Sequence, residues 1–370
     1  MRNFFKILII GSTGKLGKKL LNFTSKRNIP IDGASCFDNH KLINIQKNNY
    51  SIKNTFILSD KFSRAKFLKY LKQKFNLVYF LDYGSLSLEY IDILISHNSN
   101  CTFAIANKEL IIAGGNILQS KIAKTGNNFF PLDSEHFSLI NSNTKDSDIN
   151  KIYITASGGP FYFDKKINLE NVKKNKVLSH PKWNMGVNNL IDSSNFMNKV
   201  LEIFELSFIY NIDLKKIDFL ISKSAYVHSV IIYKNSIISV NAFYNDMLLT
   251  LASPLLKFYK IKLNTKENKI IDHSNFILET KNDNRFKIFK YLNKLRSTNH
   301  KQQIKFMILN NVAHKKYLNN EIKYNEIVSY VIKHTYKYEK INYSLNNFKN
   351  IIKYINHLRS KYSWKILFTY

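Results

Sequence analysis

The sequence predicts an α/β protein that begins with a parallel sheet and ends in helices. Residues 1–125 alternate short apolar runs with helical patterns, which is typical of a parallel sheet covered by helices. A glycine-rich turn at residues 11–17 separates the first expected strand from the first expected helix. Beyond about residue 283 the apolar side chains recur at steps of three and four, which indicates helices.

The elements follow from these patterns in chain order. In the first sheet, strands are expected at residues 5–10, 30–37, 55–58, 76–81 and 101–106. Helices are expected between them at residues 15–24, 65–75 and 88–96. From about residue 127 the pattern changes, and further strands are expected at residues 127–132, 151–155, 218–222, 226–234 and 236–244. The last two flank Lys234 and Asn235, which is consistent with an antiparallel hairpin.

Length and composition exclude several classes of protein. A chain of 370 residues is long enough for two or three domains with cores of their own. No apolar run approaches the ~18 residues of a membrane span, and the start lacks the long apolar stretch of a secretory signal. Cys36 and Cys101 are the only cysteines, which favours a reducing compartment. We therefore expect a cytoplasmic protein with no membrane partner.

The formal net charge of +30 raises the question of a nucleic-acid partner. The lysines, however, are scattered among Asn and Ile along the whole chain, and they form no single basic block with interleaved aromatic residues. This composition is what an AT-rich coding bias would produce. We expect no specific nucleic-acid partner.

The glycine-rich turn reads Gly11-Ser-Thr-Gly14-Lys-Leu-Gly17. Between a strand and a helix, such a turn lets backbone N–H groups and the helix N-terminus approach a pyrophosphate, which favours a dinucleotide. The spacing is wrong for a Walker A loop. A tight turn without a ligand is the alternative. All eleven glycines lie at or before Gly186, so backbone positions of special geometry are concentrated in the first half.

An acidic motif, Asp133-Ser134-Glu135-His136, follows an apolar run. Carboxylates two residues apart on an extended segment point to the same side, which suits a hard divalent cation. Capping of a helix by Asp133 explains the motif equally well.

Residues 192–205 add a second polar group. If the whole segment is one helix, four polar side chains share a face: Asn195, Asn198, Lys199 and Glu202. Two amides, a cation and a carboxylate would serve a phosphate beside a metal, although a solvated helix face is the plainer interpretation.

Two further loops are candidates for ligand contacts. Ser157 precedes Gly158 and Gly159, and consecutive glycines beside a hydroxyl can form a backbone anion site or simply end a strand. The loop from His180 to Gly186 contains Trp183, one of two tryptophans, which is either a core anchor or part of a lid.

Taken in order, these segments resemble the signature of the 1-deoxy-D-xylulose 5-phosphate reductoisomerase family. The glycine turn resembles the family's GSTGSIG, Ala106-Asn-Lys-Glu109 its ANKE, and Asp133-Ser-Glu-His136 matches DSEH. Residues 156–161 resemble its SGGPF segment and residues 180–186 its HPNWSMG. Asp192-Ser193 with Met197-Asn-Lys199 and Glu202 resembles DS…MNKGLE. The resemblance extends from residue 4 to about residue 255.

The resemblance implies three domains: an N-terminal Rossmann-type parallel sheet that binds the dinucleotide (1–125), a central α+β catalytic and dimerisation domain (126–265) and a C-terminal helical bundle (280–370). It implies a homodimer joined partly through the central sheet. The implied reaction converts 1-deoxy-D-xylulose 5-phosphate, a phosphorylated sugar, to 2-C-methyl-D-erythritol 4-phosphate in isoprenoid precursor synthesis. It uses NADPH and Mg²⁺ or Mn²⁺, in a metal-assisted skeletal rearrangement followed by hydride transfer.

The resemblance also implies roles for residues of this chain. The implied metal ligands are Asp133, Glu135 and Glu202. The implied substrate contacts are Lys108, Ser134, Glu135, Ser157, His180, Ser193, Asn198, Lys199 and Glu202, of which Lys108, Glu135 and His180 would be catalytic. The implied cofactor contacts are Gly11, Thr13, Gly14, Lys15, Leu16, Asn39, Asn107, Glu109 and Gly186. Trp183 would close over the site.

The chain also departs from the family's pattern. Lys15 and Val200 replace small residues, Val187-Asn188 stand where a basic residue is usual, and residues 222–225 replace HPQS. Asp38 stands near the position of a basic residue that favours NADPH. The alternatives to this function are another Rossmann-fold, metal-dependent oxidoreductase of a phosphorylated small molecule, or a basic scaffold or nucleic-acid-binding derivative of a decayed enzyme.

Overall fold

The protein is represented by a computed structural model that describes residues 5–179, 186–261, 263, 273–339 and 343–362. The first sheet has six parallel strands, in the order β3-β2-β1-β4-β5-β6. Their bounds are β1 (Ile7–Ile10), β2 (Gly33–Cys36), β3 (Asn54–Ile57), β4 (Leu77–Phe80), β5 (Thr102–Ile105) and β6 (Asn128–Pro131). The order reverses between β1 and β4, the place where such sheets bind dinucleotides.

Helices cover both faces of this sheet, so its central strands are apolar along their whole length. Odd residues of β1, such as Ile7 and Ile9, pack with α1 (Lys15–Ser25) and α2 (His40–Asn49). Even residues, such as Leu8 and Ile10, pack with α3 (Lys61–Tyr70), α4 (Ser87–His97) and α5 (Lys108–Lys124). The alternation follows from the two-residue period of a strand.

Two later segments also belong to this layer. Strand β6 pairs with β5, so the sheet continues beyond the expected domain boundary at residue 125. Helix α10 (Met247–Leu256) packs on the same face as α1, and the Tyr79 hydroxyl donates to the Leu251 carbonyl at 2.7 Å. Two elements that were expected in the central domain, β6 and α10, therefore form part of the layer around the six-stranded sheet.

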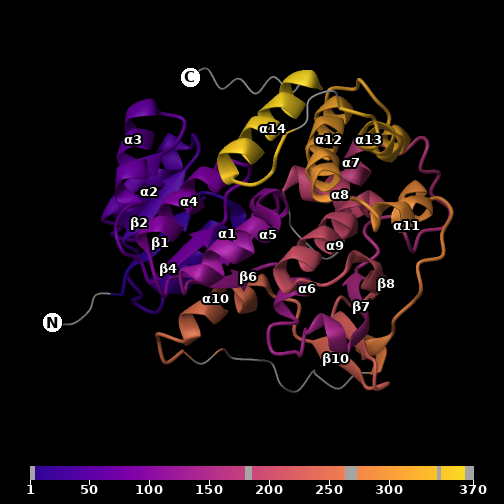
Figure 1. Ribbon diagram of the computed structural model, residues 1–370, viewed down its shortest axis with the longest axis horizontal. Helices are drawn as coiled ribbons and strands as arrows, with labels where there is room; N and C mark the ends of the chain where they lie inside the picture. The colour runs from indigo at the N-terminus through magenta and orange to yellow at the C-terminus, as the bar shows by residue number, and fades with distance from the viewer. Residues whose placement is uncertain (1–4, 180–185, 262, 264–272, 340–342, 363–370) are drawn as a thin grey trace.

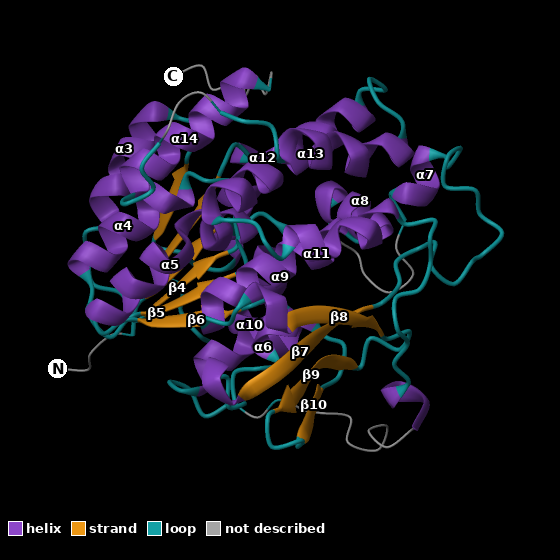
Figure 2. Cartoon of the chain, turned by 45° about the vertical axis from the view of Figure 1, so that its right-hand side comes forward, coloured by secondary structure: helices purple, strands orange, loops and turns teal. Residues whose placement is uncertain are grey.

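The second sheet has four strands in the order β10-β9-β7-β8 (Figure 2). Its strands are β7 (Ile149–Ala156), β8 (Ile217–Ile221), β9 (Val227–Tyr233) and β10 (Ile238–Ala242). The predicted hairpin is confirmed, because β9 and β10 pair antiparallel. The parallel pair β7 and β8 is joined by a long connection that contains α7 (Lys174–Val177), α8 (Val187–Asn195) and α9 (Met197–Tyr210).

Residues 192–205 do not form one helix, so the condition for the shared polar face of four side chains is not met. Phe196 adopts φ 65°, in the left-handed region, and separates α8 from α9. Asn195 therefore belongs to α8, is buried, and its side chain accepts from the backbone N–H of Met197. Asn198, Lys199 and Glu202 remain together on α9.

The C-terminal part is helical, as predicted (Figure 1). Its helices are α11 (Leu292–Leu295), α12 (His300–Leu318), α13 (Ile327–Thr335) and α14 (Phe348–Lys361). Helix α12 packs on α13 and α5, and α14 packs on α4 and α5 of the first layer. Within the described ranges, no helix has both the length and the apolar character that a membrane crossing needs. The parallel sheet, the mixed second sheet and the terminal helices confirm the predicted fold class.

Candidate metal and phosphate site

A cavity of about 230 Å³ lies where the two sheets meet. Its wall is formed by the first residues of α1, by the segments that follow β5, β6 and β7, and by α8 and α9. It therefore lies at the carboxyl ends of parallel strands, where open α/β sheets bind ligands.

Three carboxylates converge in this cavity. Asp133 and Glu135 follow β6, the last strand of the first sheet, while Glu202 comes from α9. One oxygen from each lies within 4.8 Å of the others. Asp133 also caps the short helix α6 (Ser134–Phe137), since its side chain accepts from the Glu135 N–H at 3.2 Å. The metal-ligand and capping interpretations of this motif are thus compatible.

Two lysines neutralise part of this acidic group. The Lys199 ammonium donates to Glu135 at 2.6 Å and to Glu202 at 2.5 Å. The Lys108 ammonium, at the start of α5, donates to Asp133 at 3.0 Å and to Glu205 at 2.9 Å. With all four carboxylates ionised, the four negative and two positive side chains carry a net charge of −2, which one divalent cation would balance.

Burial and neighbouring charges displace the pKa values of these groups in opposite directions. Burial raises the pKa of Glu202 well above its ordinary value, and the attraction of Lys199 only partly opposes this. Burial alone would also raise the pKa of Asp133, but Lys108 and the other charged neighbours together outweigh it and hold that pKa below its ordinary value. An oxygen donor set with excess negative charge fits a hard ion such as Mg²⁺ or Mn²⁺.

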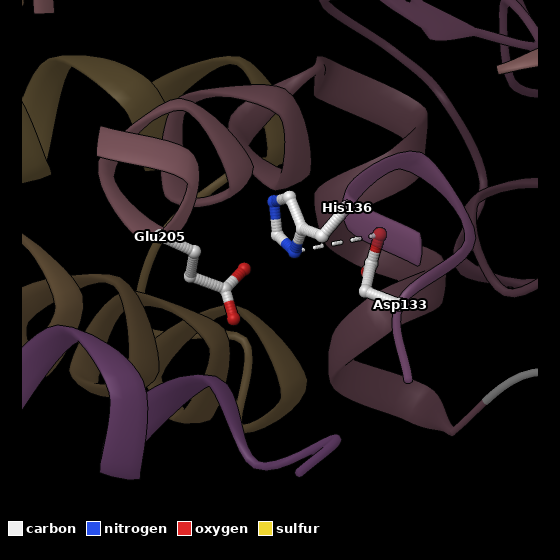
Figure 3. Close-up of side chains that lie close together, drawn as sticks. All are labelled: Asp133, His136 and Glu205. Atoms are coloured by element: carbon white, nitrogen blue, oxygen red, sulfur yellow. Dashed lines mark ion pairs between the residues drawn. The ribbon is translucent and has the colours of Figure 1, made fainter. Parts of the chain in front are cut away.

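A second acidic group adjoins the first, and the motif analysis did not identify it. Asp133, His136 and Glu205 also bring one ligand atom each within 4.8 Å (Figure 3). Glu205 follows Glu202 by three residues on α9, so both carboxylates lie on one side of the helix. Only the helical spacing from Glu202 could have indicated Glu205, because its partner Lys108 lies 97 residues away in sequence.

The predicted phosphate ligands line the same cavity. Ser157, Ser193, Asn198 and Lys199 all contribute to its wall. Gly159 adopts φ 59°, and a Cβ there would lie 2.6 Å from the Ser193 carbonyl oxygen. Glycine at this position therefore allows the loop after β7 to approach α8, which brings Ser157 and Ser193 into one cavity.

The glycine turn has the geometry expected of a cofactor site. Gly11 adopts φ 89°, and a Cβ there would lie 2.5 Å from the Asp82 nitrogen, so the turn can contact the end of β4. Gly14 precedes α1 without a side-chain cap, while Lys15 and Leu16 line the cavity. Thr13 lies in the same turn. Uncapped N–H groups at this helix end suit a pyrophosphate.

Other predicted cofactor residues lie at different places around the first sheet. Asn39 follows β2 and caps α2 by accepting from the Leu42 N–H at 3.1 Å. Gly186 lines the cavity and precedes α8. Asn107 and Glu109 are buried and do not line the cavity.

Asn107 and Glu109 are held by protein contacts. The Asn107 amide donates to Asp82 at 3.2 Å and to the Gly84 carbonyl at 3.1 Å. Glu109 accepts from Asn311 of α12 at 2.6 Å. Burial raises the pKa of Glu109 to about 7 and that of Asp82 to about 6. Asp82 is a further polar residue at the switch point that the motifs did not single out.

Two predicted residues lie outside the described part of the chain: His180 and Trp183. Among the remaining substrate contacts, Ser134 lines the cavity, and its hydroxyl donates to Glu135 at 2.5 Å. Of the departures from the family pattern, Val200 is buried in the core, and Asn188 donates to the Tyr83 hydroxyl at 3.0 Å. His228, which follows the altered segment 222–225, lines the cavity.

Comparisons with known proteins agree in sequence and in fold. A family model described as the 1-deoxy-D-xylulose 5-phosphate reductoisomerase C-terminal domain matches residues 129–210. The reductoisomerase of Pelagibacter ubique is 31% identical over 349 residues, covering 89% of this chain and 90% of the relative. That of Clostridium novyi is 28% identical and covers 97% of this chain and 99% of the relative.

Solved structures show the same architecture. The Zymomonas mobilis reductoisomerase in complex with NADPH superposes with a TM-score of 0.81 at 19% identity, covering 97% of this chain and 98% of that one. A reductoisomerase in complex with NADPH, fosmidomycin and magnesium also gives a TM-score of 0.81 at 19% identity, with 98% of both chains covered.

Proposed function

Since the chain belongs to the 1-deoxy-D-xylulose 5-phosphate reductoisomerase family, we propose that its cavity converts this sugar phosphate to 2-C-methyl-D-erythritol 4-phosphate. One observation carries the proposal. Asp133, Glu135 and Glu202 converge on one ion's space in the cavity that also holds Ser193 and Lys199. A metal and a phosphate would thus be bound side by side, as a rearrangement of a phosphorylated ketose requires.

The cofactors are NADPH and a divalent cation, Mg²⁺ or Mn²⁺. The relatives solved with NADPH and magnesium support both, and the glycine turn and the three carboxylates fit them. When bound, the cation supplies Lewis acidity toward the ketone and a neighbouring hydroxyl, and NADPH supplies the hydride.

The side chains of this protein bind and orient the substrate. Lys199, Ser157, Ser193 and Asn198 would hold the phosphate, and binding energy gained there would fix the reacting carbons beside the carboxylates. The Lys108 ammonium, already directed at Asp133, would donate to a substrate oxygen. Ser134 and Glu135 would contact the same oxygens.

A homodimer joined through the second sheet completes the proposal. Strand β10 is an edge strand, and it presents apolar side chains to solvent: Ile238 is 60% exposed and Val240 47%. A row of exposed apolar side chains on an unpaired edge suits a second copy of the same surface. A cytoplasmic location is consistent with two free, buried cysteines.

The test is NADPH oxidation that depends on both 1-deoxy-D-xylulose 5-phosphate and Mn²⁺, with identification of the product. We expect turnover only when all three are present. If NADPH is oxidised with a different sugar phosphate but not with 1-deoxy-D-xylulose 5-phosphate, the protein is an oxidoreductase of another substrate. Oligonucleotide binding at physiological salt without turnover would favour the scaffold alternative.

A further inference from the structure

The Lys108 ammonium lies within a second acidic group beside the proposed metal ligands. Its nitrogen is 3.0 Å from an Asp133 oxygen, 2.9 Å from a Glu205 oxygen and 3.8 Å from a Glu202 oxygen. The Glu205 side chain is only 1% exposed. A carboxylate so deeply buried needs a partner of opposite charge, and Lys108 is that partner.

His136 contributes a buried nitrogen directed at the same place. Its side chain is 0% exposed, and its Nε2 lies 3.0 Å from the Glu202 carbonyl oxygen. A carbonyl oxygen only accepts, so Nε2 donates to it, and Nδ1 is the ring nitrogen left to face the acidic group. Nδ1 has no hydrogen-bond partner among the described residues and faces Asp133 at 3.9 Å (Figure 3).

We propose that Asp133, His136 and Glu205 form a second cation position next to the metal ligands, and that the Lys108 ammonium occupies it as a built-in cation. Two carboxylate oxygens and an imidazole nitrogen are a donor set that binds divalent transition metals. Asp133 belongs to both groups, as a bridging carboxylate does between two metals.

This arrangement gives Glu205 a definite role. It is a positioning residue that holds the ammonium of Lys108 on the cavity wall beside the proposed metal ligands, and His136 supplies the third donor of the group. A metal and an ammonium side by side can act on two substrate oxygens at once, which other enzymes achieve with two metal ions. The inference rests on the proposed function only in taking Asp133, Glu135 and Glu202 as ligands of the first ion.

The first experiment counts Mn²⁺ bound per chain by equilibrium dialysis and records its electron paramagnetic resonance spectrum. We expect one ion in the wild type, two in Lys108→Ala with a spectrum broadened by neighbouring ions, and one in Lys108→Ala/Glu205→Gln. Lys305→Ala is the matched control, because Lys305 is a buried lysine paired with Glu339 away from the cavity, and it should bind one ion.

The counts separate the two proposals. One ion in the wild type and one in Lys108→Ala would show that there is no second cation position. Two ions in the double variant would show that Glu205 is not part of it. A wild type that binds no Mn²⁺ would instead contradict the proposed function.

The second experiment tests the positioning role in the intact enzyme. Glu205→Gln should lower kcat/KM by about 10- to 100-fold, as loss of a residue supporting a site does, and Glu205→Asp should recover part of it. When Glu205→Gln is added to Lys108→Met, kcat/KM should fall almost no further, because Glu205 acts through Lys108. Additive losses at equal thermal stability would show that Glu205 acts independently and would overturn its assigned role.

Discussion

Lys199 and Glu202 lie three residues apart on α9, and the ammonium of the first donates to the carboxylate of the second at 2.5 Å. The same ammonium donates at 2.6 Å to Glu135, which follows β6 of the six-stranded sheet. One lysine thus holds together two of the three proposed metal ligands. A cation held by these two carboxylates would replace the ammonium as their partner, and Lys199 would then contact the substrate phosphate.

The proposed metal ligands give the first prediction. Glu202→Gln should lower metal-dependent turnover by more than about 100-fold, because it removes a charge directed at one ion. Mn²⁺ affinity, measured by equilibrium dialysis, should fall with it. Glu321→Gln is the control, since Glu321 is exposed and pairs with Lys316 far from the cavity. A Glu202→Gln protein that keeps wild-type Mn²⁺ affinity would remove Glu202 from the metal site.

Lys199→Ala should separate phosphate binding from metal binding. Losing one charge-assisted hydrogen bond costs about 1.5–3 kcal/mol, so KM for the sugar phosphate should rise roughly 10- to 150-fold. Mn²⁺ should bind at least as tightly as before, because an ammonium that competes for Glu135 and Glu202 is gone. Lys199→Arg keeps the charge and serves as the control. An unchanged KM with weakened Mn²⁺ binding would contradict this assignment.

Asp82 should make stability depend on pH. Burial raises its pKa to about 6, whereas an unfolded Asp titrates near 4. The folded protein therefore holds this proton more tightly, and the free energy of unfolding should fall as the pH rises from about 4 to about 6. Asp82→Asn removes the effect, so above pH 6 it should be the more stable protein by up to about 3 kcal/mol. Urea unfolding at pH 4, 5, 6 and 7.5 measures the difference, which should vanish at the lowest pH.

Cofactor preference should depend on Asp38. This residue is exposed two positions after β2, where a dinucleotide-binding sheet meets the adenosine ribose. An acidic group there disfavours the 2′-phosphate of NADPH, and Lys41 on α2 opposes it. Asp38→Lys should raise the ratio of kcat/KM for NADPH over NADH. The same ratio in both proteins would show that Asp38 does not face the ribose.

The proposed dimer should depend on β10. Replacing Ile238 and Val240 by lysine should weaken self-association at least about tenfold, because each buried apolar side chain contributes about 1.5–3 kcal/mol. Sedimentation velocity measures the dissociation constant. Phe62→Lys is the matched control, since Phe62 is 70% exposed but lies on α3. Wild-type dimers in the double lysine variant would place the interface elsewhere.

Much of the fold could be predicted because local patterns were strong. The apolar strands and the glycine turn follow simple rules of burial and backbone geometry. Two helices of the first layer were missed. Helix α2 is largely polar, with Ile43 and Gln46 as its buried residues, and α5 contains Gly115 at φ 49°, which interrupts its helical geometry.

The site was predictable where its residues share a motif, and less so where packing brings them together. Phe196 in the left-handed region could not be expected, since a bulky residue rarely adopts it, and this turn moved Asn195 out of the proposed face. The pairing of Lys108 with Glu205 depends on α5 and α9 lying side by side, which sequence periodicity does not encode.

The proposed metal ligands come from two different layers of the molecule. Asp133 and Glu135 follow β6 of the six-stranded sheet, whereas Glu202 lies on α9, which packs against β7 and β8. A bound ion would therefore crosslink the six-stranded sheet to the layer formed by α9 and the second sheet. Removing the ion with a chelator should then speed amide hydrogen exchange in α6 and α9 together, while amides at the centre of the six-stranded sheet stay protected from exchange. The ion would help fix the relative position of the two layers before any substrate binds.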